Sequence, residues 1–435
     1  MKNYDKLIIF TRFPEPGKTK TRLIPHLGAE GAAQLQKEMT EHAVKQAHRS
    51  GARIEIRYTG GSLAQMRDWL GADLAYAEQG GGDLGERMER AFSKHFKEGV
   101  QRIVIIGSDC PSNDWENMEE AFHALKTNEC VIGPASDGGY YLIGLCRAGA
   151  LSPLPRSRPS ATFPSELFQG IDWRGEHVFE QTMKAASELT VAELKQLDDV
   201  DRPEDIPSKI SVIIPTLNEE LHLFQAIGRA REGFNVEVIV ADGGSRDRTL
   251  EKTVGACVIE CNQGRAAQQN EGAKASTGDI LLFLHADTIL PDGWDWVVRE
   301  TLRDSTIALG AFTFRIKEKI RGLKFIEDIA NWRSKRGGLP YGDQGLFMRK
   351  KTFEQVGGFP DMPIMEDYAL VRALRRFGEV VTVPAAAVTS GRRWQQHGVF
   401  KVTLINKLMI LGYHLGIPPE RLARFYRCRR AACDT

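Results

Sequence analysis

The chain has 435 residues, of which 42% are hydrophobic and 26% are charged, as is typical of a soluble globular protein. At about 100–200 residues per domain, this length predicts two or three domains. The 58 lysines and arginines are balanced by 57 aspartates and glutamates, which argues against general nucleic-acid binding, because that requires a basic field. Phosphate ligands need only local positive charge and are not excluded.

The seven cysteines are scattered, and no two of them have the CxxC spacing of a zinc site or a redox pair. This pattern argues against a disulfide framework and favours a reduced, cytoplasmic setting. The N-terminal segment lacks the apolar core of a signal peptide, and the chain has no run of about 18 uncharged apolar residues. We therefore expect no membrane-spanning helix.

The first expected strand, residues 6–12 (KLIIFTR), leads into a basic loop at 13–23 (FPEPGKTKTRL). The cations in or beside this loop are Arg12, Lys18, Lys20 and Arg22. Backbone N–H groups and cations at a strand end suit a diphosphate or a triphosphate. The spacing is not that of a Walker A loop, and a solvated basic loop is the alternative interpretation.

Three expected strands end close to an aspartate. Asp109 follows RIVIIGS in the first half, and Asp242 and Asp287 follow VEVIVA and ILLFLHA in the second half. Ligands of open α/β sheets bind beyond the carboxyl ends of the strands, so these carboxylates are well placed for chemistry. The alternative for each of them is a capping role at the next helix.

A second strand opening begins at residue 210 (ISVIIPTLNEE), directly after the acidic, proline-containing segment 197–209 (LDDVDRPEDIPSK). Short β-branched runs that lead through a loop into a helical pattern begin βαβ units. Two such openings predict two α/β domains. We place their boundary in this segment, which gives domains 1–207 and 208–435.

The second domain contains, in this order, VIIPTLNEE from Val212, VIVADGGSRDRT from Val238, FLHADT from Phe283, GDQGLF from Gly342 and MEDYAL from Met365. These segments resemble, in the same order, the motifs of family 2 inverting glycosyltransferases, which have the GT-A fold. The resemblance covers residues 210–380 and implies a nucleotide-sugar donor and an acceptor that the residues do not identify.

The resemblance assigns residues to the nucleotide. Pro215, Asn218 and Glu219 are expected at the base and the ribose. Asp242 is expected to accept a hydrogen bond from the base or the ribose, as a carboxylate is able to do. Arg265 is expected beside the nucleotide as well.

Asp287 corresponds to the metal-binding carboxylate of the family's D-x-D motif, and oxygen ligands suit Mg²⁺ or Mn²⁺. Such a cation would neutralise the leaving nucleoside diphosphate. His285 replaces the first acid of the motif, which leaves fewer carboxylates for the metal.

The pair Glu366–Asp367 resembles the family's catalytic pair. An inverting transfer needs a base that deprotonates the acceptor hydroxyl, and we expect Asp367 in that role with Glu366 as the second choice. An acidic helix start is the alternative. Asp343 and Gln344 are expected to contact the acceptor or a phosphate.

The segment RRWQQH from Arg392 resembles the Q-x-x-R-W segment of processive relatives without its leading glutamine. Arg393 is expected to hold phosphate and Trp394 to stack on a sugar, with a structural role as the alternative. Residues 399–417 (VFKVTLINKLMILGYHLGI) are interpreted as a packing helix that closes the domain. A helix on the inner membrane surface that presents the site to a lipid acceptor is the alternative.

The first domain, residues 5–205, resembles an uncharacterised GT-A-like family related to the sugar-phosphate and cofactor nucleotidyltransferases. The segments that carry this resemblance are QGGGDLGERM from Gln79, IGSDCPS from Ile106, GPASDGGYYLIG, which contains Asp137, and DVDRPEDI, which contains Asp201. The resemblance implies that Asp109 and Asp201 hold Mg²⁺, that Asp137 is a further contact, and that the basic loop holds an NTP attacked by a sugar phosphate. PEPGKTKTR replaces the family's G-G-x-x-x-R-x-G loop.

The expected fold is therefore α/β, with two tandem GT-A-like, Rossmann-like domains. The leading hypothesis is a two-step enzyme that activates a sugar phosphate in the first domain and transfers the sugar in the second. A non-catalytic nucleotide-binding or docking module is the alternative for the first domain, and a non-enzymatic scaffold is the alternative for the whole chain.

Overall fold

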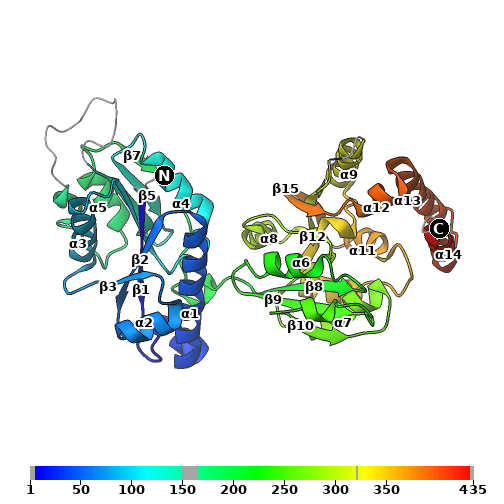
Figure 1. The fold of residues 1–435 in the computed structure, drawn as a ribbon, viewed down its shortest axis with the longest axis horizontal. Helices are drawn as coiled ribbons and strands as arrows, with labels where there is room; N and C mark the ends of the chain where they lie inside the picture. The colour runs from blue at the N-terminus through cyan, green and yellow to red at the C-terminus, as the bar shows by residue number, and fades with distance from the viewer. Residues whose placement is uncertain (1–4, 148–163, 320–321, 432–435) are drawn as a thin grey trace. The chain divides into compact units, whose positions relative to one another are not determined.

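The computed structural model describes residues 5–147, 164–319 and 322–431, and it leaves the side chains of Arg393, His397 and residues 427–431 undescribed. The chain forms two compact units, residues 1–206 and 207–435 (Figure 1). Each unit contains one sheet.

The first unit is built on a seven-stranded sheet. Its strands are β1 (Asp5–Arg12), β2 (Arg53–Thr59), β3 (Ala75–Glu78), β4 (Arg102–Gly107), β5 (Cys130–Pro134), β6 (Tyr140–Cys146) and β7 (Val191–Glu193). Their order across the sheet is β3-β2-β1-β4-β6-β5-β7. The strands from β3 to β4 in this order are parallel, whereas β6 is antiparallel to both β4 and β5.

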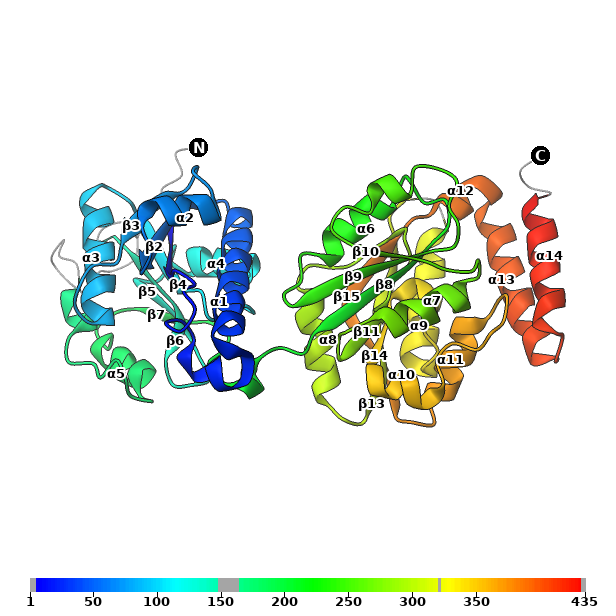
Figure 2. The same cartoon turned by 90° about the horizontal axis from the view of Figure 1, so that it is seen from below.

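Helices cover both faces of this sheet. They are α1 (Ile24–Arg49), α2 (Leu63–Leu70), α3 (Leu84–Lys97), α4 (Trp115–Ala124) and α5 (Val178–Ala185), with short 3₁₀ turns at Thr21–Leu23, Ser165–Phe168 and Pro203–Asp205. Side chains alternate along β1, so Leu7 and Ile9 pack with α1, α2 and α4, whereas Ile8 and Phe10 pack with α3 and α5 (Figure 2). Because β1 is buried on both faces, its central residues form a continuous apolar run without alternating polar residues.

The second unit has an eight-stranded sheet. Its strands are β8 (Ile210–Thr216), β9 (Val236–Asp242), β10 (Cys257–Glu260), β11 (Ile280–Phe283), β12 (Thr288–Ile289), β13 (Ile307–Ile316), β14 (Leu346–Arg349) and β15 (Glu379–Thr389). Their order is β10-β9-β8-β11-β14-β13-β15-β12. Apart from the extra edge strand β12, this order and these strand directions repeat those of the first unit.

The helices of the second unit also form two layers. They are α6 (Leu223–Ala230), α7 (Arg265–Ala275), α8 (Trp294–Arg303), α9 (Leu323–Gly337), α10 (Lys350–Val356), α11 (Glu366–Leu374), α12 (Arg392–His397), α13 (Val399–His414) and α14 (Pro419–Ala431), with 3₁₀ turns at Leu250–Lys252 and Gly342–Gln344. Helices α6 and α8 pack on one face, and α7, α10 and α11 pack on the other (Figure 2). Helix α11 packs in turn against α13 and α14.

The shared strand order fixes where a ligand is expected in each unit. After β3 the chain crosses to the opposite side of β1 and forms β4, and after β10 it crosses to the opposite side of β8 and forms β11. The switch points therefore lie between β1 and β4 and between β8 and β11. In open α/β sheets the crevice at such a switch point is the usual binding site. Within the described ranges, no helix is both long and apolar enough to cross a membrane.

Candidate functional site

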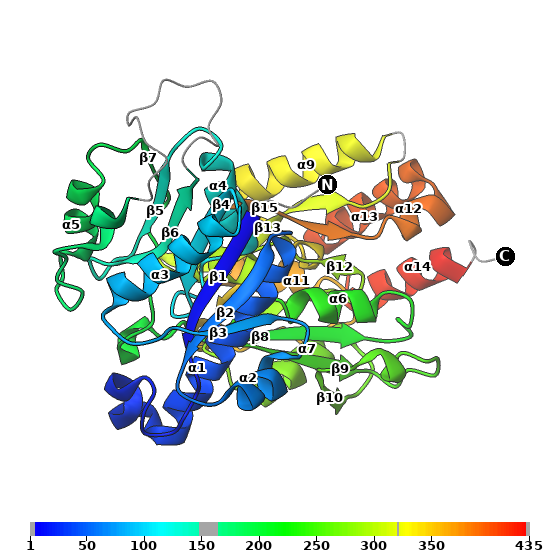
Figure 3. The same ribbon diagram turned by 60° about the vertical axis from the view of Figure 1, so that its left-hand side comes forward.

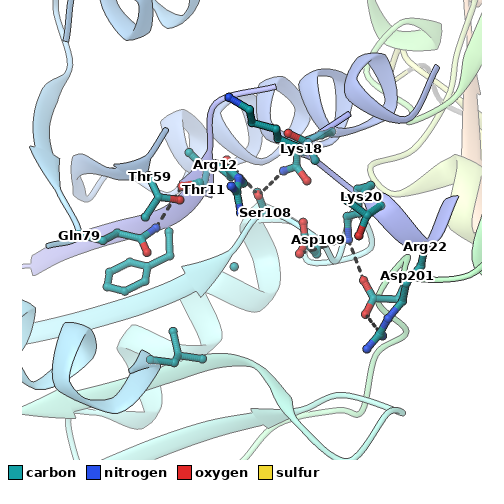
Figure 4. Close-up of a pocket in the computed structure, with 16 residues that line it drawn as sticks. Thr11, Arg12, Lys18, Lys20, Arg22, Thr59, Gln79, Ser108, Asp109 and Asp201 are labelled. Carbon is teal, nitrogen blue, oxygen red and sulfur yellow. Dashed lines mark hydrogen bonds and ion pairs between the residues drawn. The ribbon is translucent and has the colours of Figure 1, made fainter. Parts of the chain in front are cut away.

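The first unit has a pocket of about 450 Å³ at its switch point. Its walls come from the ends of β1, β2 and β4 and from the basic loop that follows β1 (Figure 4). The polar residues that line it are Thr11, Arg12, Lys18, Thr19, Lys20, Thr21, Arg22, Gln36, Thr59, Gln79, Ser108, Asp109 and Asp201. The structure therefore brings together six residues that the sequence had singled out separately: Arg12, Lys18, Lys20, Arg22, Asp109 and Asp201.

Buried hydrogen bonds hold the floor of this pocket. The side-chain amide of Gln79 donates to the carbonyls of Thr11 and Arg57, both at 3.0 Å, and so joins the ends of β1 and β2. The amide of Gln36 donates to the hydroxyl of Ser108 at 2.9 Å, which ties α1 to the end of β4. A hydrogen-bonded floor of this kind keeps the strand ends rigid around the pocket.

Lys20 lies at the centre of the charged wall. Its backbone is left-handed, with φ of 47°, and its side chain is only 6% exposed. The ammonium group donates to the carbonyl of Val200 at 2.7 Å and to Asp201 at 2.9 Å, and it lies 3.2 Å from Asp109. Burial opposes the charge, yet the attraction of Asp109 and Asp201 raises the pKa of Lys20 above its ordinary value.

The other cations of the loop lie nearer to solvent. Arg22 binds the second oxygen of Asp201 at 3.0 Å and is 73% exposed, and Lys18 pairs with Glu15 at 2.6 Å. Arg12 is also exposed at the end of β1. These three side chains are free to turn towards an anionic ligand, because exposed ion pairs hold their partners weakly.

The arrangement around Lys20 does not fit the expected Mg²⁺ between Asp109 and Asp201. A cation already lies among the oxygens of both carboxylates and a carbonyl. A bridging Mg²⁺ at the same place would require the buried ammonium to leave. The structure thus differs from the expectation, because the loop that follows β1 supplies its own positive charge at this point.

Asp137 lies outside the wall described above. It is exposed, and its carboxylate accepts a hydrogen bond from the backbone of Gly139 at 2.8 Å. Burial, together with the charges of Asp137 and Asp201, raises the pKa of the neighbouring Asp199 to about 6. Asp137 therefore belongs to an acidic edge beside the pocket.

In the second unit, the loop after β8 holds the residues expected at the nucleotide. Pro215 lies near the end of β8, and Asn218 has a left-handed backbone with φ of 54°. The side chain of Asn218 accepts a hydrogen bond from the backbone of Arg246 at 2.8 Å, and the backbone of Glu219 donates to Thr249 at 2.7 Å. These bonds join the loop after β8 to the loop after β9.

Asp242 is almost completely buried at the end of β9. One oxygen accepts from the backbone N–H groups of Gly244 and Ser245, both at 2.9 Å, and the other accepts from the Ser245 hydroxyl. The carboxylate therefore holds the turn that directly follows β9 and does not cap a helix, since the next helical turn, Leu250–Lys252, has Thr249 at its N-cap. Beside it, the amide of Gln268 donates to the carbonyls of Thr216 and Ala241, both at 2.7 Å, and joins β8 to β9.

Asp287 lies after β11 and faces a residue that the sequence analysis did not select, Arg392. The guanidinium of Arg392 lies 3.5 Å from Asp287 and binds one oxygen of Glu219 at 2.5 Å. The other oxygen of Glu219, Oε2, is buried and has no hydrogen-bond partner among the described residues. Arg392 thus connects the expected nucleotide loop to the expected metal ligand.

The acidic residues of this site surround Arg265. Burial opposes its charge, yet Glu366, Asp367, Asp287 and Asp343 together raise the pKa of Arg265. Burial is also the main cause that raises the pKa of Asp343 to about 6, with Asp367 and Asp287 adding to the effect. The site therefore carries more negative than positive charge.

This surplus fits a divalent cation, which would relieve the repulsion between the carboxylates. No group of three or more potential ligands lies close enough to hold an ion by itself within the described parts of the chain. Mg²⁺ commonly takes one or two carboxylates and completes its shell with water and substrate phosphates. Asp287 is suited to that mode, and Asp343 is a further carboxylate of the same site.

Glu366 and Asp367 begin α11 but have different surroundings. Glu366 is 3% exposed and lies 3.4 Å from Arg265, and burial raises its pKa. Asp367 is half-buried, and its Oδ2 accepts from the backbone of Gly342 at 2.8 Å. A Cβ at Gly342 would lie 3.0 Å from His285 and 3.2 Å from Asp367, so this glycine permits a close approach of the three segments.

The remaining predicted residues have structural surroundings. Gln344 is completely buried, and its amide donates to the Phe312 carbonyl at 2.9 Å and to Ser334 at 3.1 Å. Trp394 packs against Phe314, with ring centroids 6.4 Å apart. The side chain of Arg393 lies outside the described residues. The structure thus places Gln344 and Trp394 in supporting positions, which is the alternative stated for Trp394.

Comparison with known proteins yields two family matches. Residues 42–174 match "Uncharacterized protein conserved in bacteria (DUF2064)", and residues 211–357 match "Glycosyl transferase family 2". One match lies in each unit, and both parts of the predicted resemblance are confirmed. The predicted fold, two tandem GT-A-like α/β units, is also confirmed.

Individual relatives cover parts of the chain. A dolichol-phosphate mannosyltransferase of Pyrococcus furiosus is 33% identical over 24% of this chain and 33% of its own length. An uncharacterized glycosyltransferase of Haemophilus influenzae is 26% identical over 37% of this chain and 59% of its own. The chain thus spans less than two thirds of the length of these relatives. Its second unit is similar to glycosyltransferases.

Solved structures of similar proteins include one from Desulfovibrio desulfuricans named for nucleotide-diphospho-sugar transfer. It is 34% identical, with 46% of this chain and 83% of that chain covered and a TM-score of 0.42. Glucosyl-3-phosphoglycerate synthase of Mycobacterium tuberculosis, solved with Mn²⁺, UDP and phosphoglyceric acid, is 22% identical. That match covers 48% and 80% of the two chains, with a TM-score of 0.37.

Proposed function

We propose that the second unit transfers a sugar from a nucleotide-diphospho-sugar to an acceptor hydroxyl, with inversion at the anomeric carbon and Asp367 as the base. The observation that carries this proposal is the position of Asp367. Its carboxylate is held by the Gly342 N–H at the same acidic site that contains Asp287 and Arg265. A family 2 glycosyl transferase match over residues 211–357 supports the reaction class.

Asp367 is a better base than Glu366 for geometric reasons. Glu366 is buried against Arg265, so its carboxylate is not accessible to an acceptor hydroxyl. Asp367 is partly exposed and is oriented by two backbone N–H groups, those of Gly342 and Tyr368. An oriented carboxylate within reach of the acceptor removes its proton as the oxygen attacks the anomeric carbon.

The donor is bound by the loop after β8 and by Arg392. The unpartnered Oε2 of Glu219 is suited to accept a hydrogen bond from a ribose hydroxyl. Arg392 lies between Glu219 and Asp287, where its guanidinium is placed for a diphosphate oxygen. Asp287 would hold Mg²⁺ or Mn²⁺, which supplies charge neutralisation for the departing nucleoside diphosphate.

The first test is the release of nucleoside diphosphate from a panel of nucleotide sugars with Mg²⁺ or Mn²⁺. Wild type is compared with Asp287→Ala, with Asp367→Asn and with Asp328→Asn, a matched control at an exposed position of α9. We expect Asp367→Asn to lower turnover by about 10²–10⁴-fold while nucleotide binding is retained. Full turnover by Asp367→Asn would exclude it as the base, and turnover independent of Asp287 would exclude its metal role.

For the first unit, we propose that the pocket binds the phosphates of an NTP for attack by a sugar phosphate. The support is the pocket at the switch point and the exposed cations Arg12, Lys18 and Arg22 along it. These cations would stabilise the charge of the triphosphate as pyrophosphate leaves. A non-catalytic nucleotide-binding or docking module uses the same cations without chemistry.

Pyrophosphate release distinguishes these two roles. The assay combines NTPs with sugar phosphates, and NTP affinity is measured separately by calorimetry. We expect Arg22→Ala to weaken NTP binding by about tenfold, since a charge-assisted hydrogen bond to phosphate is lost. Arg53→Ala, at the opposite end of β2, is the matched control and should leave binding unchanged. If the first unit binds NTP but releases pyrophosphate with no combination of NTP and sugar phosphate, the docking role is favoured.

A further inference from the structure

Helix α13 is apolar on two opposite faces. Its inner face contains Val402 and Met409, and Met409 packs in one cluster with Tyr368 of α11 and Leu422 of α14. Its outer face is a row of large apolar side chains, exposed by 42–92%, which we call the α13 stripe: Phe400, Leu404, Leu408, Leu411 and Leu415. The spacing of three or four residues places them along one side of the helix. A helix that is apolar all round is normally buried on every side.

The same region is strongly basic. Residues 392–431 contain nine lysines and arginines against one acid, Glu420, and so carry a net charge of +8 in a chain whose net charge is +1. Lys407 on α13 and Arg421 and Arg424 on α14 are exposed. The region that contains the α13 stripe is therefore both apolar and able to attract anions.

A second exposed apolar row begins beside the first. On α9, Phe325, Ile329 and Trp332 are exposed by 69%, 38% and 68%. The start of α9 approaches the start of α13, because a Cβ on Gly322 would lie 3.7 Å from Val399 (Figure 3). The two helices that carry these exposed apolar rows therefore begin close together.

We propose that the α13 stripe docks on the surface of a lipid bilayer that contains anionic phospholipids. Helices with an apolar face and basic flanks lie in the plane of such an interface, where apolar burial and attraction to anionic headgroups act together. α13 itself does not meet the requirements for crossing the bilayer. A second copy of the chain is disfavoured as the occupant, because it would bring a second +8 segment against the first.

Docking in this way brings the candidate active site to the membrane. The hydroxyl of Tyr368 on α11 lies 2.7 Å from His414 Nε2 at the end of α13. The pair Glu366–Asp367 begins the same helix α11. One layer of helix, about 10 Å, therefore separates the stripe from the element that carries the candidate base. The docking surface does not depend on the proposed transfer reaction.

The test is sedimentation of the full chain with vesicles of phosphatidylcholine alone or mixed with phosphatidylglycerol. Two variants remove the two parts of the surface: Phe400→Ser with Leu404→Ser, and Lys407→Gln with Arg424→Gln. Their matched controls are Leu63→Ser with Val254→Ser, both exposed apolar positions elsewhere, and Lys126→Gln with Lys184→Gln in the first unit. The thermal unfolding midpoint of each variant is measured to check that the variant folds. We expect the midpoint to stay close to that of wild type, because all the substituted side chains are exposed.

We expect the wild type to bind the anionic vesicles, less tightly at higher salt, and to bind phosphatidylcholine weakly. Each surface variant should lose binding by about tenfold or more, whereas the controls should not change. The proposal is overturned if wild type does not sediment with anionic vesicles, or if the Phe400 and Leu404 variant binds as wild type does. It is also overturned if wild type is a dimer that this variant converts to monomer without an effect on vesicle binding.

Discussion

The ammonium group of Lys20 lies among oxygens of Asp109, Asp201 and Val200, where the sequence resemblance had implied a metal ion. Ion pairs with both carboxylates hold this ammonium group, although the Lys20 side chain is only 6% exposed. In the second unit, the corresponding acid Asp287 faces the guanidinium group of Arg392 instead. The two units therefore balance their strand-end carboxylates with different cations.

The position of Lys20 predicts a change in metal binding. In an Asp287→Ala background, which removes the expected metal ligand of the second unit, we expect Lys20→Met to raise Mn²⁺ affinity by about tenfold or more. The reason is that Asp109 and Asp201 then lose their resident cation. Mn²⁺ titration followed by electron paramagnetic resonance measures the change. Adding Asp109→Asn should abolish the gain, and tight Mn²⁺ binding at Asp109 without the Lys20 substitution would contradict the assignment.

At the scale of elements, each unit joins its first two strands by a buried amide. Gln79 donates to carbonyls of β1 and β2, and Gln268 donates to carbonyls of β8 and β9. Both amides lie where the parallel strands end and the loops begin. Because each amide donates to carbonyls at the ends of two adjacent strands, the two amides fix the strand ends that carry the candidate ligand loops.

At the opposite ends of the strands of the second sheet, a carboxylate also links neighbouring strands. Glu237 on β9 accepts hydrogen bonds from Ser211 on β8 and from Thr277 before β11, and it pairs with Lys209 at 2.9 Å. Burial opposes its ionisation, but these donors lower the pKa of Glu237 to about 2. The ionised form therefore stabilises the junction of three strands.

This lowered pKa predicts a loss of stability in acid. A carboxylate whose folded pKa lies below its unfolded value of 4.5 stabilises the fold above that pH, and the contribution disappears as pH falls towards about 2. Glu237→Gln should cost roughly 1 kcal/mol at neutral pH, after allowance for solvent screening. Denaturant unfolding at neutral and acid pH measures it. The difference in unfolding free energy between Glu237→Gln and wild type should become smaller in acid. The control Glu251→Gln, at an exposed position, should show no such trend.

At the scale of the whole molecule, each unit has cores of its own. The clusters around β1 contain residues of the first unit alone, and those around β8 contain residues of the second unit alone. Each sheet is covered by helices on both faces. A unit with a complete core of this kind is able to fold independently.

We therefore expect residues 1–206 and 207–435, expressed separately, each to unfold in one cooperative transition. Calorimetry of the two fragments and of the full chain measures this. The fragment 207–435 should also retain nucleotide-sugar turnover, if the proposed transfer is correct. A fragment that remains unfolded, with exposed apolar surface, would show that its core depends on the other unit.

The sequence by itself determined the elements and their kinds. The strands expected at 6–12 and from 210 are present as Asp5–Arg12 and Ile210–Thr216, and the helix expected at 399–417 is present as Val399–His414. These predictions succeeded because apolar patterning is local and sets which face of an element is buried. The basic loop and Asp109 were found because each follows an apolar strand, whereas Asp201 was found through the resemblance of its segment to a known family.

Only the tertiary structure decided which charges meet. Arg392 contacts Glu219 across 173 positions of sequence, and Lys20 contacts Asp201 across 181. No local pattern encodes such pairs, because sheet topology and loop conformation bring them together. The same reason explains why the sequence left two alternatives for residues 399–417, a packing helix and a helix on the membrane surface. The sequence shows which residues are apolar, but the packing of α11 and α14 decides which of them are covered.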